Sequence, residues 1–164
     1  IGLVMQNPNQ MISKPMIFDE VALGLQVRGV PEEEIKERVN ETLKICGLYQ
    51  MRNWPVSALS FGQKKRVTIA SILVMNPKMM ILDEPTAALD PIAEAEIYAR
   101  FDEIVGDKTA IYISHRLSSC RFCDKIAVFH EGEIVQVGTH EELLQDENGK
   151  YYELWNAQAQ YYTV

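Results

Sequence analysis

Hydrophobic residues form two patterns along this chain. Uninterrupted apolar runs, which are typical of buried strands in a parallel sheet, occupy residues 1–5, 79–82 and 110–113. Between these runs, helices are predicted over Pro31–Cys46, over Lys64–Met75, and from Asp90-Pro91 to Gly106. Apolar residues at helical spacing give the first of these helices a buried stripe, which consists of Ile35, Val39, Leu43 and Cys46.

The last third of the chain predicts local structure with clear turn and cap chemistry. Ile126–Phe129 and Ile134–Val137 flank Glu131-Gly132, which is typical of a β-hairpin. Thr139 and Glu142 have the spacing of a capping box at the start of a short helix. We therefore expect a hairpin followed by a capped helix.

Three further features have a structural explanation that we favour over a functional one. His140, inside the short helix, is expected to be a surface residue. The aromatic segment Tyr151–Tyr162 is expected to be a terminal helix packed on its own domain, with a docking helix for a partner as the alternative. Cys46, Cys120 and Cys123 are expected to be reduced thiols, because Cys120-x-x-Cys123 has no second Cys or His pair at zinc spacing.

Two short strings carry chemistry. The strand at residues 79–82 is followed by Asp83 and Glu84, where it meets solvent. One carboxylate can hold Mg²⁺ through water and the other can polarise an attacking water. Leu59-Ser60-Phe61-Gly62-Gln63 opens the second helix, and a helix N-terminus with a capping hydroxyl is a ready anion site. Together the strings indicate nucleotide hydrolysis.

Polar residues also follow the other two apolar strands. Gln6 comes after the first strand, and Ser114-His115 comes after the third. Ligands of open parallel sheets bind beyond the carboxyl ends of the strands. We therefore expect Gln6, the Asp83-Glu84 pair and His115 to converge on one edge of the sheet.

Five motifs in this order resemble those of ATP-binding cassette (ABC) ATPases. They are Gln6-Asn7-Pro8 (Q-loop), Leu59–Gln63 (signature, with Phe61 where glycine is more usual), Met79–Glu84 (Walker B), Ala87–Asp90 (D-loop) and Ser114-His115-Arg116 (switch histidine). The resemblance covers nearly the whole chain. It implies an α/β fold, a partial P-loop NTPase (RecA-like) ABC ATPase core with a parallel sheet and a helical signature subdomain. It also implies an ABC-type ATPase that energises transmembrane transport.

The resemblance implies one partial ABC ATPase domain over residues 1–164. Residues 1–8 would be the Q-loop strand and residues 9–76 the helical subdomain with the signature. Residues 77–164 would be the C-terminal part of the catalytic core, with the Walker B strand, D-loop and switch histidine.

The same resemblance implies roles for individual residues. Asp83 and Gln6 would hold Mg²⁺, Glu84 would be the general base or orient the attacking water, and His115 would contact the γ-phosphate of the substrate ATP. In this family two cassettes enclose two nucleotides head to tail. The residues that would act across that dimer are Ser60, Gly62 and Gln63, which would bind the partner's ATP, and Asp90, at the interface.

The phosphate-binding loop of such an ATPase does not occur in this sequence. Gly24 to Gly29 has the Gly-x-x-x-x-Gly spacing but continues with Val30-Pro31 instead of Lys-Ser/Thr, and no strand pattern precedes it. The interpretation is that the chain, which begins at Ile1, is a fragment truncated before the Q-loop. We expect it to hydrolyse no ATP alone.

The two halves of the chain resemble different branches of the family. Val4 to about Met80 resembles ATPases of energy-coupling-factor importers, and the sequence from about Leu89 onward resembles exporter-type ABC ATPases. The change from one resemblance to the other falls near Leu82–Thr86. The hypothesis is that two cassette genes were joined there, by recombination or by faulty assembly.

Composition narrows the class of partner. A net charge of −7 argues against a nucleic-acid surface, and the apolar run Ile69–Met75 is too short to cross a bilayer. The expected partners are a transmembrane permease subunit or domain and a second ABC ATPase, identical or different, at the cytoplasmic face of the cell membrane. Two alternatives stay open: a non-catalytic partner that supplies its signature in trans, and an ABC ATPase of DNA repair or translation. The short span from Gln6 to Leu59, without a long heptad insertion, favours transport.

Overall fold

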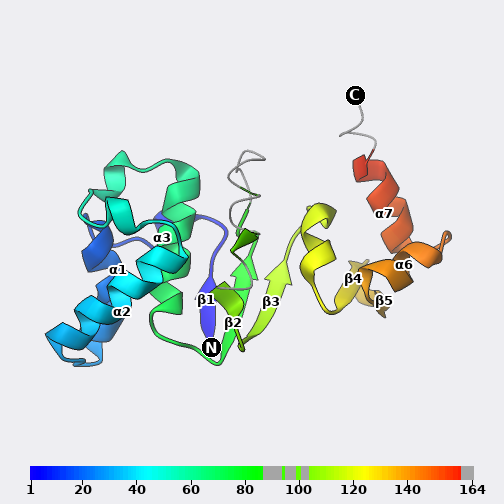
Figure 1. The fold of residues 1–164 in the computed structure, drawn as a ribbon. Coiled ribbons are helices and arrows are strands. Elements are labelled where there is room, and N and C mark those ends of the chain that lie inside the picture. The colour runs from blue at the N-terminus through cyan, green and yellow to red at the C-terminus, as the bar shows by residue number, and fades with distance from the viewer. Residues whose placement is uncertain (87–93, 95–98, 101–103, 160–164) are drawn as a thin grey trace. The chain divides into compact units, whose positions relative to one another are not determined.

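A computed structural model of the protein describes residues 1–86, 94, 99–100 and 104–159 (Figure 1). The chain divides into two compact units, Ile1–Ile113 and Ser114–Val164. The first unit contains a parallel sheet and a group of helices, and the second contains a hairpin and shorter helices.

The sheet of the first unit is parallel, as predicted. Its strands are β1 (Gly2–Val4), β2 (Met79–Asp83) and β3 (Thr109–Ile113), paired in the order β1-β2-β3. β1 from the predicted Q-loop segment thus pairs with β2 from the predicted catalytic segment. Because β2 pairs in parallel with both β1 and β3, the carboxyl ends of the three strands lie at the same edge of the sheet.

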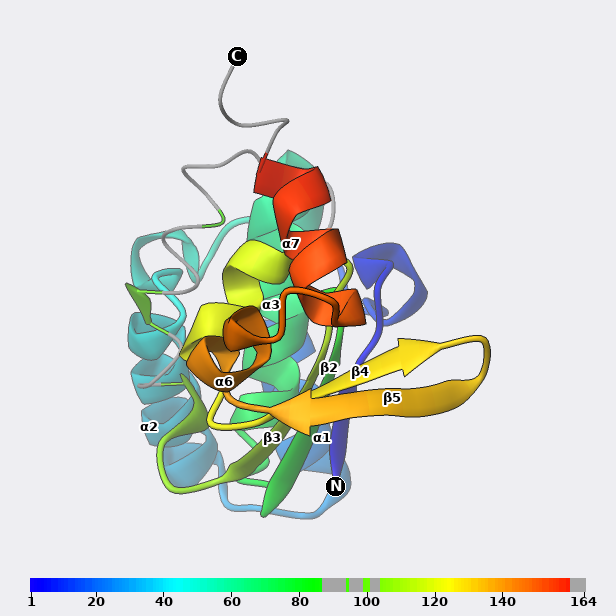
Figure 2. The same ribbon diagram turned by 90° about the vertical axis from the view of Figure 1, so that its right-hand side faces the viewer.

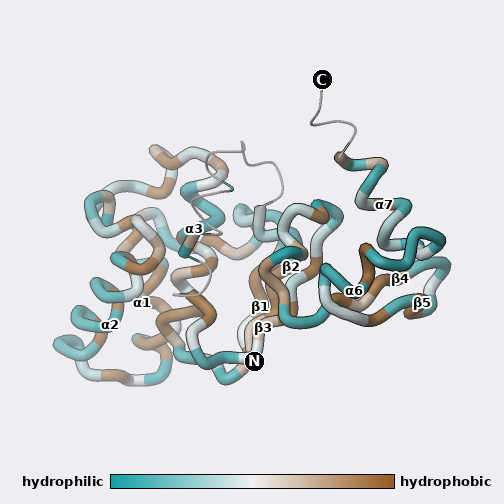
Figure 3. The backbone as a smooth tube through the Cα atoms, turned by 45° about the vertical axis from the view of Figure 1, so that its right-hand side comes forward, coloured by the Kyte–Doolittle hydropathy of each residue, from teal (hydrophilic) through white to brown (hydrophobic). Residues whose placement is uncertain are grey.

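Among the residues of the first unit that the structure describes, the main helices are α1 (Ile17–Val27), α2 (Glu32–Ile45) and α3 (Phe61–Leu73). They gather beside the sheet in Figure 1, and Figure 3 shows apolar residues along the strands they accompany. The core joins strand and helix residues. Its strand members are Val4, Met80 and Leu82, and its members from the predicted helical stripe are Ile35, Val39, Leu43 and Cys46.

The predicted ends of α2 have a clear cause. Three glutamates occupy its first turn, where they interact favourably with the helix dipole. Gly47 follows the helix with φ of +68°, a left-handed conformation that costs glycine little. The amide of Leu48 then donates to the carbonyl of Leu43 at 2.8 Å, which closes the helix end.

The expectation that β3 is buried on both faces was wrong. Ile111 and Ile113 are each 46% exposed, and on β1 Leu3 is 49% exposed. The described helices of this unit cover the face that carries Val4, Met80 and Leu82, so the alternate residues of the same strands stay open. The uninterrupted apolar runs therefore do not mark strands buried on both faces. The described residues cover one face of this sheet.

The second unit confirms the predicted hairpin and capped helix. β4 (Ile126–His130) and β5 (Glu133–Gly138) are antiparallel, as Figure 2 shows, and both turn residues, Glu131 and Gly132, have positive φ. The capping box precedes α6 (His140–Gln145), and α7 (Lys150–Ala159) follows. A 3₁₀ segment, Leu117–Phe122, precedes the hairpin. The core of this unit consists of Leu117, Ile126, Val128, Leu143 and Tyr151.

The expectation for His140 was also wrong. His140 is buried, its Nδ1 lies 2.8 Å from the hydroxyl of Tyr151, and its ring centroid lies 4.6 Å from that of Trp155. The first helical position of α6 faces α7, which supplies both aromatic partners. The packing of α7 on its own unit confirms the favoured interpretation of the tail for the described residues; Tyr162 lies outside them.

The three cysteines are free thiols. Cys46 lies in the core of the first unit as predicted, where burial raises its pKa to about 12. Cys120 and Cys123 are half-buried beside the core of the second unit, where burial raises the pKa of each.

Candidate functional site

The register of the sheet brings two of the predicted strand ends together. Val4 pairs with Leu82, the residue before Asp83, so Met5 and Gln6 continue past β1 beside the end of β2. Asp83 in turn pairs with Ile113, the last residue of β3. The glutamine-bearing loop and the acidic pair therefore leave the sheet at the same edge.

Glu84 has an unusual backbone at this edge. Its φ is +45°, a left-handed conformation that is uncommon for a residue with a Cβ. Two hydrogen bonds hold it: its amide donates to the carbonyl of Ile113 at 2.9 Å, and its carbonyl accepts from Lys65 Nζ at 3.1 Å. The chain therefore turns sharply after β2 and keeps Glu84 largely buried, at 7% exposure.

Asp83 and Gln6 are more accessible than Glu84. Asp83 is half-buried and Gln6 is exposed. The loop after Gln6 is ordered by its own cap, because Asn7 Oδ1 accepts from the amide of Asn9 at 3.0 Å at the start of a 3₁₀ turn, Pro8–Gln10. The loop thus has a defined path away from the strand end.

These oxygens suit Mg²⁺ held jointly with a nucleotide. Over the part of the chain that the structure describes, no group of three or more His, Cys, Asp or Glu side chains is arranged to hold a metal. Mg²⁺ in nucleotide sites usually takes one or two carboxylates together with phosphate oxygens and water. The carboxylate of Asp83 and the amide oxygen of Gln6 are oxygen ligands suited to such a shared Mg²⁺ site.

Lys65 joins the two strand ends, and sequence reasoning missed it. Its side chain is fully buried, and Nζ donates to the carbonyl of Met5 at 3.0 Å as well as to that of Glu84. Burial lowers its pKa from the ordinary 10.5 to about 8, opposed by the negative charges of Asp83 and Glu84. A lysine of α3 thus fixes the main chain on both sides of the site.

The N-terminus of α3 is capped and accessible. Ser60 Oγ accepts from the amide of Gln63 at 3.2 Å, and Gln63 Oε1 accepts from the amide of Ser60 at 2.9 Å. Ser60 is exposed, and Phe61 beside it is 38% exposed. The residues predicted to form the signature therefore lie at a helix tip that is accessible to solvent.

Two predicted site residues are not joined to this edge by the structure. Asp90 lies outside the described residues. His115 belongs to the second unit, so its convergence with the acidic pair stays a prediction. Within that unit the side-chain amide of Gln158, on α7, donates to the carbonyl of His115 and accepts from the amide of Leu117 at 2.9 Å. No sequence pattern predicted that Gln158 would hold the main chain at His115 and Leu117.

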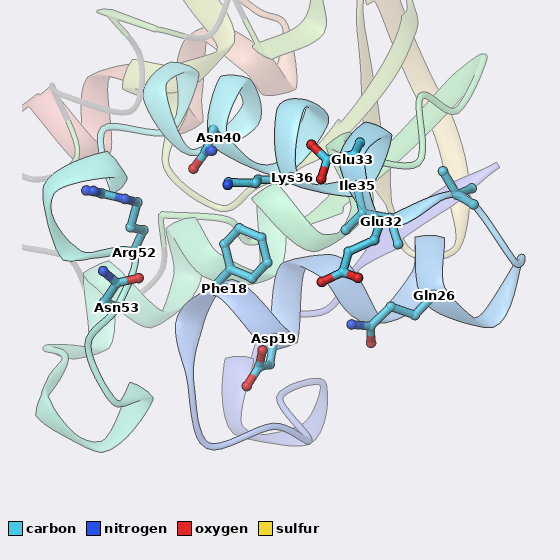
Figure 4. A pocket seen from close by; sticks show the side chains of 11 residues that line it. Phe18, Asp19, Gln26, Glu32, Glu33, Ile35, Lys36, Asn40, Arg52 and Asn53 are labelled. Carbon is cyan, nitrogen blue, oxygen red and sulfur yellow. The ribbon is translucent and has the colours of Figure 1, made fainter.

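An open hollow of about 800 Å³ lies elsewhere in the first unit (Figure 4). Phe18 of α1, Ile35 and Asn40 of α2, and Arg52 are among its lining residues. None of the predicted site residues lines it. It is a feature of the helical part, separate from the strand-end chemistry.

A parallel sheet with helices packed beside it, and with the acidic pair and the glutamine-bearing loop at one edge, has the α/β fold of the ABC ATPases. The chain belongs to the ABC transporter family, whose sequence pattern matches residues 1–87. Among the described residues, no helix is long and apolar enough to cross a membrane.

Relatives and solved structures extend the match. The chain is 57% identical over 155 residues to a putative ABC transporter ATP-binding protein of Clostridium perfringens, covering 89% of this chain and 26% of the relative. It is 53% identical over 148 residues to a putative ABC transporter ATP-binding protein of Streptococcus pneumoniae, and this match covers 89% of this chain and 26% of that relative. The chain thus spans about a quarter of the length of the curated relatives it matches.

Two solved structures are similar to this chain. One is cbiO1 from Clostridium perfringens, part of the ABC transporter complex cbiONQ, with TM-score 0.82, 37% identity, and 89% of this chain and 59% of that chain covered. The other is a bacterial Atm1-family ABC exporter with ATP bound. Its TM-score is 0.79 and its identity 31%, and the match covers 96% of this chain and 28% of that chain.

Each of these matches bears on the hypothesis of a gene junction near Leu82–Thr86. An alignment over 89% of the chain necessarily runs through those residues. One relative is thus similar to this chain on both sides, and a change of resemblance there does not require two parent genes. The junction, like the division into residues 1–8, 9–76 and 77–164, stays a hypothesis.

Proposed function

We propose that this chain is part of an ATP-hydrolysing subunit or domain of an ABC transporter, which energises transmembrane transport through a head-to-tail ATPase dimer. The observation that carries the proposal is the strand register, which brings the Gln6 loop and the Asp83-Glu84 pair to one edge of the sheet. Family membership supports ATP as the substrate.

Within the site, each residue has a task that its position allows. Asp83 and Gln6 would hold Mg²⁺, which when bound neutralises phosphate charge. Glu84 would accept a proton from the attacking water or orient it, and its buried, hydrogen-bonded main chain limits the directions available to its carboxylate. His115 would contact the γ-phosphate.

The exposed tip of α3 would serve a different nucleotide, held by a second ABC ATPase, identical or different. The amides that follow Ser60 and the positive end of the helix dipole suit phosphate oxygens. Ser60, Gly62 and Gln63 would bind that nucleotide in trans, with Asp90 at the dimer interface. Capping and phosphate binding use the same end of the helix, so the capping box preorganises the tip.

We further propose a transmembrane permease subunit or domain as a partner, which would hold the ATPase at the cytoplasmic face of the cell membrane. The solved relative cbiO1 is part of a multi-subunit ABC transporter complex, which supports this arrangement. The acidic net charge of −7 supports a protein partner over nucleic acid.

The test of the main proposal uses Glu84→Gln in a full-length ABC protein that carries residues 1–164 together with a P-loop segment. We expect ATP hydrolysis to fall by about 100-fold or more, because a base or water-orienting group is lost, while ATP affinity changes little. Glu37→Gln, an exposed change on α2, is the matched control. An equal loss of ATP affinity in Glu84→Gln, or unchanged hydrolysis, would contradict the role of Glu84.

A further inference from the structure

Lys65 occupies a position where a lysine is costly. Its side chain is fully buried in the first unit, within α3, and removal of an ammonium group from water is unfavourable unless hydrogen bonds replace the lost solvation. Its Nζ donates to two main-chain carbonyls, that of Met5 at 3.0 Å and that of Glu84 at 3.1 Å. The charge is therefore compensated by backbone oxygens and by the nearby carboxylates of Asp83 and Glu84.

Both carbonyls lie just beyond the last paired residues of their strands. The β1–β2 ladder ends at Val4 and Leu82, one residue before Met5 and two before Glu84. A buried carbonyl beyond the end of a strand ladder has no partner on the neighbouring strand, so it needs another hydrogen-bond donor. One ammonium group supplies that donor to both strand ends at once, which ties the loop of Gln6 to the turn of Glu84.

The same lysine also connects these strand ends to the signature. Ser60 precedes Lys65 by five residues, which corresponds to about 7.5 Å along an α-helix. The capping box fixes Ser60 to the first turn of α3, and Lys65 fixes the second turn to the site. A displacement of the helix tip would therefore act directly on the main chain beside Gln6 and at Glu84.

We propose that Lys65 is a positioning residue for ATP hydrolysis, which holds Gln6 and Glu84 in register and transmits engagement of the signature helix to the subunit's own acidic pair. This inference rests on the proposed function. Alignment supplies much of the rate in phosphoryl transfer, so a small shift of Glu84 or Gln6 slows the chemical step. The signature would thus sense the partner's nucleotide and adjust this subunit's own site through one side chain.

The experiment compares three variants in the full-length protein that carries this chain and a P-loop. Lys65→Met keeps the aliphatic stem and removes the donors, Lys65→Arg keeps charge and donors, and Lys64→Met is the matched control on the same helix. Lys64 makes a part-exposed 3.5 Å contact to Asn9 Oδ1, so the control also loses a contact to the Gln6 loop.

We expect Lys65→Met to lower kcat for ATP by on the order of 10- to 100-fold with little change in KM, since alignment is lost while binding is retained. Lys65→Arg should restore most of kcat, and Lys64→Met should behave as the parent protein. A kcat for Lys65→Met equal to that of Lys64→Met would overturn the inference, as would an equal loss of kcat in Lys65→Met and Lys65→Arg.

A second measurement separates this inference from the proposed function. Hydrogen exchange of peptides covering residues 1–9 and 79–86 reports the tether even in a protein that hydrolyses no ATP. We expect faster exchange in both peptides for Lys65→Met than for Lys64→Met. An inactive parent protein with this difference would refute the proposed function alone, and equal exchange would refute the tether. Should Lys65→Met not fold, Lys65→Gln, with a shorter side chain and an amide donor, is compared in its place.

Discussion

Two helices of this chain begin with the same hydrogen-bonding device. At α3 the pair is Ser60 and Gln63, and at α6 it is Thr139 and Glu142; in both, the side-chain oxygen accepts at 3.2 Å and the return bond is 2.9 Å. Yet we assign phosphate binding to the first tip only. On this assignment, a capping box alone does not make a phosphate site.

Charge and length distinguish the two tips. α6 has Glu141 and Glu142 in its first turn and spans six residues, so its dipole is small and already neutralised. α3 spans thirteen residues and has no acidic residue in its first turn. On the proposed assignment, the electrostatics of the first turn distinguish the phosphate-binding tip of α3 from the tip of α6.

The largest expected difference between the tips comes from a bulky cation at each cap. Ser60→Arg should abolish ATP-dependent dimerisation of the full-length protein, because the side chain would occupy the place of the partner's nucleotide. Thr139→Arg should leave it intact. Size-exclusion chromatography with light scattering, with and without ATP, measures both. An ATP-dependent dimer unchanged in Ser60→Arg would remove the distinction between α3 and α6.

A smaller effect, of opposite sign for stability and function, is expected from a negative charge in the first turn of α3. Phe61→Glu should stabilise α3 by about 0.3–1 kcal/mol through the dipole. It should also weaken nucleotide-dependent dimerisation by about tenfold, the equivalent of about 1.4 kcal/mol of repulsion.

The control for that change is Glu141→Gln in α6, which should lower stability by a similar fraction of a kcal/mol and leave dimerisation unchanged. Urea unfolding and ATP-titrated dimerisation on the same samples measure both quantities. Tighter dimerisation in Phe61→Glu would mean that the tip of α3 does not meet phosphate.

Local chemistry explains which parts of this structure the sequence could predict. The N-cap at Ser60, the capping box of Thr139 and Glu142 and the hairpin turn at Glu131-Gly132 are determined by neighbours in the sequence, and all three were predicted. The strand ends with their polar residues were likewise predictable, because a parallel sheet aligns its carboxyl ends.

The misses all depend on contacts between distant residues. Lys65 follows another lysine in a charged stretch, and its burial depends on Met5, 60 residues away, and on Glu84. His140 was assigned to the surface because its partner Tyr151 comes from another helix. The exposure of Ile111 reflects which face of the sheet the described helices cover, which a run of apolar residues does not specify.

The buried cation of α3 makes the stability of the first unit depend on pH. The folded-state pKa of Lys65, about 8, lies below its ordinary 10.5, so the folded state binds fewer protons between these values. Unfolding then takes up protons, and the contribution of Lys65 to stability rises with pH from about 8 to 10.5. Urea unfolding at stepped pH should show this rise relative to Lys65→Met. An identical pH profile for the two proteins would contradict the lowered pKa.

The smallest difference is expected when each cap loses only its hydroxyl. Ser60→Ala and Thr139→Ala should each lower the free energy of unfolding by about 1 kcal/mol, since the two boxes make the same bonds at matching distances. Ser60→Gly and Thr139→Gly should cost only a few tenths of a kcal/mol, because glycine caps nearly as well. Hydrogen exchange of the first turn of each helix separates the two units. A cost at α3 much larger than at α6, with the glycine variants no better than alanine, would mean that Ser60 holds more than its own helix and that the tips differ in structure as well as in charge.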